Sequence, residues 1–250
     1  MARADIHFHL LPGVDDGPAS IEESVELARA ARGDGTRAIV ATPHVRGDFV
    51  TDVGVLPELV RSVGERLAHA GIELALRCGA ELGHDMVGRL GQEDLELIAL
   101  GPPAARWLLV ETPFEGIDEG VHAATDELRD RGFAVVLAHP ERSAGLLDER
   151  EPALRHELSR GTLLQVNALS LLGRHGPRAL DAGRRLIVEG LADLIASDAH
   201  SLAREPALTP ATRAAVAAGL TPPAARRLTD ANPSRLLNRG LAASPAPAAV

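Results

Sequence analysis

Short apolar runs alternate with amphipathic segments along most of the chain. Several runs, such as 133–138, are continuously apolar, which is typical of parallel strands covered on both faces. We predict strands at 4–8, 37–42, 72–78, 106–111, 133–138, 163–167 and 192–197, with a further strand near 95–100. Helical patterns begin at Ser20 and recur at 55–70, 118–131, 149–160 and 176–189. This alternation favours an α/β fold with a (β/α) barrel.

Towards the C-terminus, Thr209-Pro210 and Thr221-Pro222 each predict a helix start with proline at the first helical position. The second of these helices is expected to stop before Pro233. The sequence contains no internal repeat and no long linker. We therefore expect a single domain over residues 1–240, followed by a disordered tail at 241–250 that is rich in alanine and proline.

Histidine and carboxylate side chains stand where several predicted strands end. The strings are Asp5-Ile6-His7-Phe8-His9, Thr42-Pro43-His44, Gly79-Ala80-Glu81, Ala138-His139-Pro140-Glu141-Arg142 and Ser197-Asp198-Ala199-His200. In a strand, positions i and i+2 share a face, so His7 and His9 can reach one ion. Imidazole and carboxylate are ligands of Zn²⁺, Mn²⁺ and Fe²⁺. The pattern predicts a hydrolase with several metal ions.

Composition narrows the class of protein. The net charge of −9 gives no general attraction for nucleic acid or an anionic membrane. The single cysteine, Cys78, excludes an intramolecular disulfide framework and agrees with a reducing compartment. No apolar run reaches the ~18 residues that a membrane span needs. The ligand-rich first strand leaves no room for a signal peptide, so we expect a cytoplasmic protein without a membrane span.

Taken in order, these motifs resemble those of the polymerase-and-histidinol-phosphatase (PHP) superfamily of metal-dependent phosphoesterases. They are most similar to its bacterial protein-tyrosine phosphatase branch, which acts in capsule and exopolysaccharide regulation. The resemblance implies a distorted, TIM-like (β/α)7-type barrel. Val45 and Thr112 depart from the usual pattern without removing a ligand. Further strings that carry the resemblance are Leu11-Pro12-Gly13-Val14-Asp15-Asp16-Gly17, Val110-Glu111-Thr112-Pro113-Phe114, Gln165-Val166-Asn167-Ala168 and Ser170-Leu171-Leu172-Gly173.

The resemblance also implies a cluster of two to three divalent ions, manganese, iron or zinc. One ion would be held by His7, His9, Glu81 and Asp198. Glu81 would bridge to a second ion held by Glu111 and His139, and a third would be held by Asp16, His44 and His200. Asp16 could instead be an ordinary turn residue beside Gly17, with Asp15 as the more natural cap. The remaining histidines are expected at the surface: His69, His84, His122, His156 and His175.

Clustered divalent ions favour hydrolysis of phosphate monoesters by a metal-bridging hydroxide. Arg142 and Arg204 follow the candidate ligands His139 and His200 closely, so both should emerge at the rim of the site. The resemblance implies that both contact phosphate, and surface salt bridges are the alternative. Cysteine chemistry is not expected, because no arginine lies six positions after Cys78.

The resemblance implies a phosphotyrosine protein as substrate, with a bacterial tyrosine kinase as a candidate. A phenolate leaves more readily than an alkoxide, which agrees with the lack of an obvious general acid. Two alternatives stay open. The first is a histidinol-phosphate or other small-molecule phosphatase of the same superfamily. The second is a metal-stabilised binding or scaffold protein without turnover.

Overall fold

The computed structural model describes residues 3–148 and 151–243. The strands are β1 (Arg3–Phe8), β2 (Thr36–Ala41), β3 (His44–Val45), β4 (Ala75–Cys78), β5 (Glu81–Leu82), β6 (Trp107–Glu111), β7 (Ala134–Ala138), β8 (Leu163–Asn167) and β9 (Leu194–Ala196). The α-helices are α1 (Ile21–Gly33), α2 (Leu56–His69), α3 (Gln92–Ile98), α4 (Glu119–Asp130), α5 (Glu151–Ser159), α6 (Ala168–Leu171), α7 (Gly176–Val188), α8 (Leu208–Ala217), α9 (Pro222–Arg226) and α10 (Asn232–Arg239).

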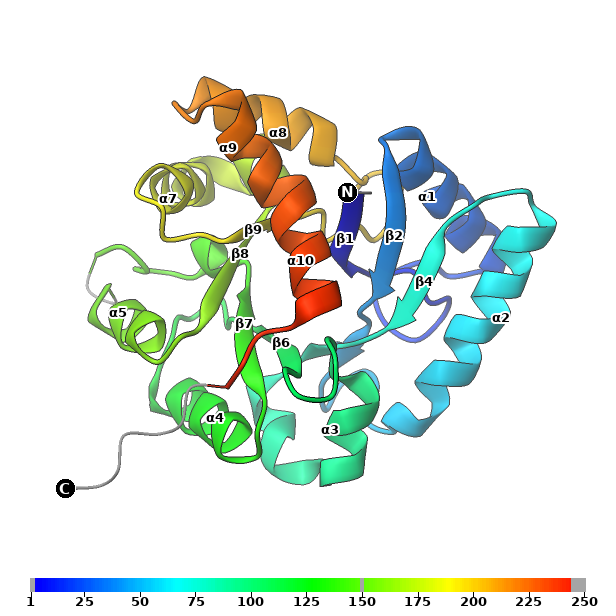
Figure 1. The fold of residues 1–250 in the computed structure, drawn as a ribbon, viewed down its shortest axis with the longest axis horizontal. Coiled ribbons are helices and arrows are strands. Elements are labelled where there is room, and N and C mark those ends of the chain that lie inside the picture. The colour runs from blue at the N-terminus through cyan, green and yellow to red at the C-terminus, as the bar shows by residue number, and fades with distance from the viewer. Residues whose placement is uncertain (1–2, 149–150, 244–250) are drawn as a thin grey trace.

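The strands form two parallel sheets, with the orders β1-β2-β4 and β3-β5-β6-β7-β8-β9. Strand β3 follows β2 after the two-residue break at Thr42-Pro43, and β5 follows β4 after Gly79-Ala80. A parallel bridge joins Phe8 to Ala199, so the end of β1 lies beside the segment that follows β9. Helices surround the strands, as Figure 1 shows. The predicted α/β fold with parallel strands is confirmed.

One predicted strand is wrong. The residues near 95–100 form most of helix α3, and only Leu100 makes an isolated antiparallel bridge, to Trp107. The local sequence favours the helix because the Asp94 carboxylate accepts a hydrogen bond from Gly91 N at 2.9 Å and caps its first turn. Leu95 and Ile98 are buried three positions apart, which is the spacing of a helical face.

The C-terminal helices also differ from expectation. Helix α8 begins at Leu208, and the Thr209 hydroxyl donates to Asp34 O instead of capping the helix. Thr221 does cap α9. The helical path does not stop before Pro233, because a π-helical turn (Arg227–Ala231) leads directly into α10, whose first turn contains Pro233. Of the expected tail, residues 244–250 lie outside the described part of the chain.

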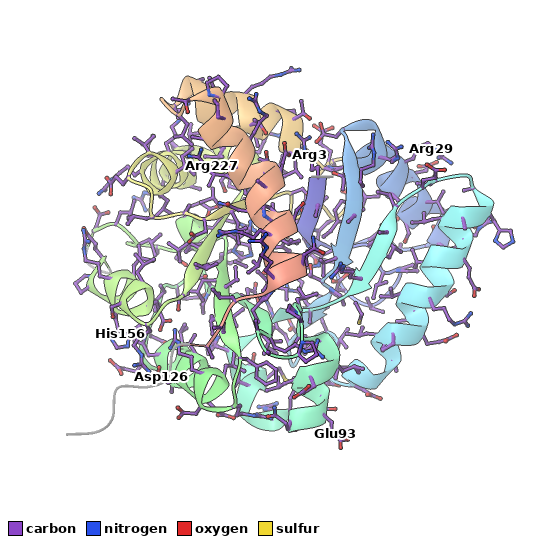
Figure 2. All side chains as sticks on the ribbon, viewed as in Figure 1. Arg3, Arg29, Glu93, Asp126, His156 and Arg227 are labelled. Carbon is purple, nitrogen blue, oxygen red and sulfur yellow. The ribbon has the colours of Figure 1, made fainter. Side chains whose placement is uncertain are left out.

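Two apolar clusters fill the interior. The larger one packs strands against helices such as α2 and α4. The smaller one, which we call the inner cluster, lies between the strands and α10, which crosses them in Figure 1. Its members include Ile6, Trp107, Val136 and Leu236. The Trp107 indole donates to Leu236 O at 3.3 Å, which ties α10 to β6. Charged side chains such as those of Arg29 and Glu93 point outward (Figure 2).

Alternate residues on three strands change from apolar to polar towards the carboxyl end. The residues that share a face are Trp107, Leu109 and Glu111 on β6, Leu163, Gln165 and Asn167 on β8, and Leu194 and Ala196 on β9, followed by Asp198. The inner cluster therefore forms the floor beneath a polar site. None of the helices in the described ranges combines the length and apolar composition needed to cross a membrane.

Candidate metal centre

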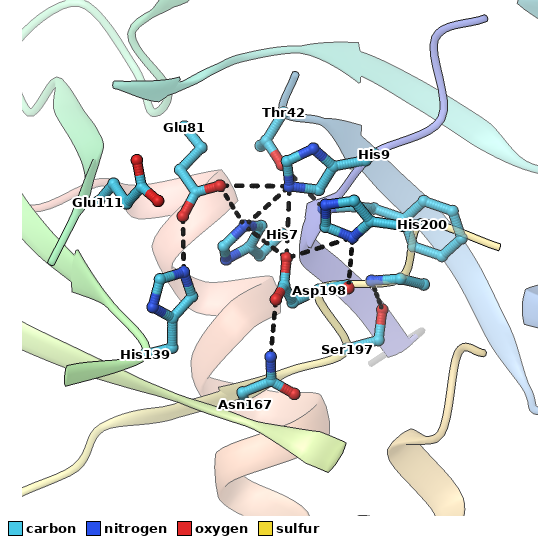
Figure 3. Close-up of polar contacts among 12 residues, drawn as sticks. His7, His9, Thr42, Glu81, Glu111, His139, Asn167, Ser197, Asp198 and His200 are labelled. Carbon is cyan, nitrogen blue, oxygen red and sulfur yellow. Dashed lines mark hydrogen bonds and ion pairs between the residues drawn. The ribbon is translucent and has the colours of Figure 1, made fainter. Parts of the chain in front are cut away.

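Four buried side chains converge at the carboxyl ends of the strands, from β1 and the residue directly after it, from β5 and from the segment after β9 (Figure 3). His7 Nε2 lies 3.2 Å from both Glu81 Oε2 and Asp198 Oδ1. His9 Nε2 lies 3.3 Å from the same two oxygens and 3.2 Å from His7 Nε2. Donors bound tetrahedrally about 2.0–2.1 Å from an ion lie about 3.3–3.4 Å apart. The spacing therefore fits a single metal ion.

Hydrogen bonding alone does not explain this arrangement. One imidazole Nε2 carries at most one proton, yet each of these nitrogens faces two carboxylate oxygens and another nitrogen. Glu81 Oε2 and Asp198 Oδ1 are buried and have no hydrogen-bond partner within the described residues. An unpaired buried carboxylate oxygen is costly, and a cation resolves that cost. The donor set thus fits the divalent ions that the sequence implies.

Each histidine beside these oxygens is held by its other ring nitrogen. His7 Nδ1 lies 2.8 Å from Gln165 Oε1, and His9 Nδ1 lies 2.7 Å from Asp15 Oδ2. His200 Nδ1 lies 2.8 Å from a backbone carbonyl oxygen, that of Asp198. All three partners accept hydrogen bonds, so the ring protons sit on Nδ1 and the Nε2 lone pairs point into the cluster. This is the usual support of metal-binding histidines.

A second group of possible ligands adjoins the first and shares His9. His200 Nε2 lies 3.1 Å from Asp16 Oδ1, and His44 Nε2 lies 3.5 Å from the same oxygen. The ligand atoms of His9, Asp16, His44 and His200 all fall within 4.8 Å of one another. The three ligands expected for the third ion, Asp16, His44 and His200, therefore lie close together, and His9 lies in the same group.

Glu111 and His139 lie on the far side of Glu81. His139 Nε2 lies 2.7 Å from Glu81 Oε1. Glu111 groups with His44 and Glu81, and its Oε2 is 3.8 Å from His44 Nδ1. His44 thus adjoins the expected set of Glu81, Glu111 and His139, because β5 lies between β3 and β6. Glu81 keeps the expected central position between the groups.

Burial and neighbouring charges determine how the site titrates. Burial alone would raise the pKa of Glu81, but the charges of His7, His44 and His139 hold it well below its usual value. Burial, reinforced by the negative charge of Glu81, raises the pKa of Glu111. Burial lowers the pKa of His44 to about 4, so this imidazole is neutral at pH 7. Burial alone would lower the pKa values of His7 and His9, but nearby carboxylates, including those of Glu81 and Asp198, raise them. A bound cation would therefore have to displace protons from these two imidazoles.

Two candidate ligands stand in left-handed backbone conformations. His139 has φ of 37° and Asp198 has φ of 52°, and within the described ranges no other non-glycine residue has a positive φ. Such a conformation costs about 1–2 kcal/mol and is typical of functional sites. Backbone hydrogen bonds hold both residues, from His139 N to Gln165 O at 2.8 Å and from Asp198 N to His7 O at 3.0 Å.

The two predicted arginines lie at the rim of the cluster. Arg142 Nη1 is 3.2 Å from Asp198 Oδ2, and its guanidinium carbon lies 4.7 Å from the centre of the Phe114 ring. Arg204 Nη1 lies 2.9 Å from Asp16 Oδ2, and its Nη2 is 3.4 Å from Asp198 Oδ2. Both guanidinium groups therefore contact candidate metal ligands and lie beside the cluster. An isolated salt bridge elsewhere on the surface would have no such contact.

The chain matches the profile of the capsular polysaccharide synthesis family CpsB/CapC over residues 3–238. This chain belongs to the CpsB/CapC family. It is 31% identical to the tyrosine-protein phosphatase YwqE of Bacillus subtilis, over 79% of this chain and 77% of that protein. It is 28% identical to the tyrosine-protein phosphatase CpsB of Streptococcus pneumoniae, over 81% of this chain and 84% of that protein.

A crystal structure from this family has the same fold. It comes from work on YwqE of Bacillus subtilis and CpsB of Streptococcus pneumoniae, which are metal-dependent tyrosine phosphatases. The match has a TM-score of 0.82 at 28% identity and covers 99% of this chain and all of the solved one. The similarity to these CpsB/CapC enzymes thus extends over the strands and loops that carry the candidate ligands.

Three residues of this CpsB/CapC site were not predicted as such from the sequence. Asp15, expected as a turn cap, does accept a hydrogen bond from Gly17 N, but it also orients His9. Its position six residues after His9 was the available signal. Arg46 donates to both oxygens of Glu111 at 3.1 and 3.2 Å. The third is His175, which interacts electrostatically with Arg142. No motif in the sequence connects His175 to the site.

Three of the histidines expected at the surface, His84, His122 and His175, are partly buried. His175 Nδ1 lies 2.9 Å from Ser170 Oγ, which donates to Glu141 at 2.7 Å. Burial, followed by the charge of Arg142, lowers the pKa of His175 to about 4. His122 Nδ1 lies 2.6 Å from Glu157 Oε1. Although His122, His156 and Glu157 lie close enough to hold an ion, the buried Arg129 already neutralises Glu157 at 2.6 Å.

Proposed function

We propose that this chain is a metal-dependent phosphatase that hydrolyses phosphotyrosine in proteins. The observation that carries the proposal is the tetrahedral spacing of the His7, His9, Glu81 and Asp198 donors directly beside Arg142. Bound cations and a guanidinium group can both interact with the negatively charged oxygens of a phosphate ester, so their proximity suits hydrolysis of such an ester. Membership of the CpsB/CapC family supports the same activity.

We further propose that the cluster binds two to three ions of manganese, iron or zinc. Bound ions would lower the pKa of a water molecule and neutralise the charge of the phosphoryl oxygens. The proposed ligands are His7, His9, Asp16, His44, Glu81, Glu111, His139, Asp198 and His200. Their overlapping groups support more than one ion, because His9, His44 and Glu81 each belong to two of them.

The arginines would bind and orient the phosphate. Arg142 and Arg204 both contact Asp198 Oδ2, so their guanidinium groups converge on one edge of the cluster. There each can offer paired N–H donors to phosphate oxygens and stabilise the charge that develops during hydrolysis. A phenolate with a pKa of about 10 leaves without a strong acid. This chemistry suits phosphotyrosine better than an alkyl phosphate.

We propose a phosphotyrosine protein in capsule or exopolysaccharide regulation as the partner, with a bacterial tyrosine kinase as the natural source of such a substrate. The names of the CpsB/CapC relatives support this assignment. We also propose a cytoplasmic location. A reducing compartment suits the single free cysteine, Cys78, and it is where intracellular kinases act.

For the fold, we propose that the two sheets belong to one distorted, TIM-like (β/α)7-type barrel within a single PHP-type domain of residues 1–240. The Phe8–Ala199 bridge supports this arrangement, because it brings the first strand beside the last. The short breaks between β2 and β3 and between β4 and β5 account for the division into two sheets. The candidate site lies at the carboxyl ends of the strands, and TIM-type barrels carry their active sites at the same end.

Parallel assays on a phosphotyrosine peptide and on histidinol phosphate test the proposed activity. We expect faster turnover of the peptide by protein loaded with manganese, iron or zinc. Much faster turnover of histidinol phosphate would support the small-molecule phosphatase and contradict the tyrosine phosphatase. No turnover of either substrate by fully loaded protein would favour a metal-stabilised scaffold protein.

A further inference from the structure

The few aromatic side chains of this chain are unevenly distributed. It has four phenylalanines, one tryptophan and no tyrosine. Phe8, Phe133 and Trp107 are buried, whereas Phe49 is 36% exposed and Phe114 is 48% exposed. Both exposed rings lie against histidines of the metal centre, because Phe49 is 5.3 Å from the His44 ring and Phe114 is 6.2 Å from the His139 ring. The rim of the site therefore holds both exposed aromatic rings.

Only one of these two rings lines a large cavity within the described structure. A cavity of about 880 Å³ lies between the segment 143–148 and α7, and Phe114 and Arg142 form part of its wall. The Phe49 ring instead stacks on His44 at an interplanar angle of 15° and does not line this cavity. Of the two rings, Phe114 is therefore the one with free space beside it.

Arg142 connects this cavity to the metal centre. Its guanidinium group contacts Asp198 at 3.2 Å and lies over the Phe114 ring at 4.7 Å. A phosphate group bound between Arg142 and the cluster would thus direct its ester substituent along Phe114 and into the cavity. Beyond Phe114, the wall combines the buried apolar side chains of Leu146 and Ala179 with charged side chains such as those of Arg178 and Arg185.

The position of Phe114 is fixed by its backbone. Ala144 N donates to Phe114 O at 2.8 Å, and Ser143 Oγ donates to Pro113 O. The loop that carries the ring is therefore tied to the segment that forms the opposite part of the cavity wall. An exposed ring held in a fixed place beside a cavity is suited to contact a second flat ring.

We propose that Phe114 and this cavity form a subsite for the phenyl ring of phosphotyrosine, and that the subsite gives the enzyme a preference for aryl over alkyl phosphate esters. This inference rests on the phosphatase activity proposed above. A phosphoserine side chain has no ring and would leave the Phe114 contact unmade. Aromatic pairs in offset or edge-to-face contact bind more tightly than area alone predicts. The volume also leaves room for peptide residues beside the tyrosine.

The test compares kcat/KM on matched phosphotyrosine and phosphoserine peptides for the metal-loaded enzyme and its Phe114→Leu variant. Leucine keeps the apolar bulk and removes the ring. We expect kcat/KM on the phosphotyrosine peptide to fall about 10-fold, mostly through KM. On the phosphoserine peptide, a change of less than about 2-fold is expected. Phe114→Tyr keeps a ring and should retain most of the activity on phosphotyrosine.

Two further variants sharpen the comparison. Val188→Ala removes an exposed apolar side chain of α7 that does not line the cavity. This variant should leave kcat/KM unchanged on both peptides. An equal loss on both peptides in Phe114→Leu would overturn the proposal, because it would show an effect through Arg142. If Phe49→Leu but not Phe114→Leu selectively lowers kcat/KM on phosphotyrosine, the phenyl ring of the substrate binds beside Phe49. That result would also overturn the proposal.

A binding measurement separates this inference from the proposed activity. A peptide with a non-hydrolysable phosphonomethyl-phenylalanine should bind the wild type about 10-fold more tightly than Phe114→Leu. If the wild type hydrolyses phosphotyrosine but binds the phosphonate no better than the variant, the ring subsite is wrong and the activity stands. If the wild type neither hydrolyses the peptide nor binds the phosphonate, both proposals fail.

Discussion

Asp15 connects two candidate ligands through one oxygen atom. Its Oδ2 lies 2.7 Å from His9 Nδ1 and accepts a hydrogen bond from the backbone N–H of His44 at 3.0 Å. Its Oδ1 accepts from Gly17 N at 2.9 Å. Burial alone would raise the pKa of Asp15, but these hydrogen bonds and the charge of His9 lower it. The carboxylate thus fixes the proton of His9 on Nδ1 without itself facing the metal centre.

Asp15→Asn should weaken metal binding about 10- to 100-fold. An amide has one acceptor oxygen, so it cannot accept at both sides as the carboxylate does, and its NH₂ group must face an N–H donor. Titration of the metal-free protein with Mn²⁺ or Zn²⁺ measures the change. Asp52→Asn is a matched control, because Asp52 Oδ1 accepts from Gly54 N at 2.9 Å in a similar turn outside the cluster. Equal affinity in both variants would remove Asp15 from the site.

Arg142→Ala should lower kcat/KM on an aryl phosphate about 100-fold or more and leave the metal content unchanged. Arg204→Ala should act in the same direction with a smaller effect, because this side chain is 34% exposed against 20% for Arg142. Steady-state kinetics and elemental analysis measure both quantities. Arg184→Ala, at an exposed position of α7, is the control. Unchanged rates in both rim variants would assign these arginines to structural ion pairs.

The fully loaded protein should contain two to three divalent ions per chain, and chelators should abolish its phosphatase activity. His7→Ala and Glu81→Ala should each lose more metal than His69→Ala, since His7 and Glu81 are buried in the cluster and His69 is exposed on α2. Elemental analysis after dialysis against each metal gives the stoichiometry. A content of one ion or none in the wild type would contradict a multinuclear centre.

Thiol alkylation should leave the activity intact. Burial raises the pKa of the Cys78 thiol to about 11, so very little reactive thiolate exists at pH 7. Cys78 lies on β4 and is not among the candidate ligands. Activity after iodoacetamide treatment, compared with that of a Cys78→Ala variant treated in the same way, measures the effect. Inactivation of the wild type alone would show that the cysteine takes part in catalysis.

The buried ion pair of Arg129 and Glu157 should make the free energy of unfolding depend on pH. Burial raises the pKa of Glu157, but hydrogen bonds from His122 and Arg129 outweigh it and lower the value below normal. The ionised carboxylate therefore stabilises the fold at neutral pH, and this contribution is lost as pH falls below about 4.5 and through the folded-state value. Glu157→Gln should lower the free energy of unfolding by about 3 kcal/mol at pH 7 and by less near pH 4.

Urea denaturation at the two pH values measures this difference. Glu65→Gln is the control, because Glu65 pairs with Arg61 on the exposed face of α2. Loss of such an exposed pair should change stability by less than about 1 kcal/mol. A Glu157→Gln effect that is the same at both pH values would show that packing, and not the charge of the carboxylate, sets the contribution.

Much of the strand pattern could be predicted because buried parallel strands are continuously apolar. The run that contains β7 has this character, and the predicted strand at 133–138 agrees with β7 within one residue. The same property misled at 95–100, where a short apolar run belongs to helix α3. Periodicity cannot separate the two over so few residues, and the deciding Gly91–Asp94 cap lies just outside the run.

The candidate ligands could be named because strand ends of a parallel sheet meet at one edge. Their partners were harder to find. Arg46 reaches Glu111 across 65 positions of sequence, and Gln165 reaches His7 across 158. Such contacts depend on how the strands pack side by side, which a single sequence does not encode locally. The proximity of His44 to Glu111 depends on the same packing, because β3 and β6 both flank β5.

Helix α10 carries Leu236 and Leu237 into the inner cluster, although it is the last helix of the described chain. A ribosome makes the strands first and this helix last, so the nascent chain exposes the floor beneath Trp107 until about residue 240 has emerged. A chain that terminated shortly before α10 would keep its candidate ligands but present an apolar surface to chaperones and proteases. The inner cluster is therefore covered only after α10 has been synthesised and has packed against the strands.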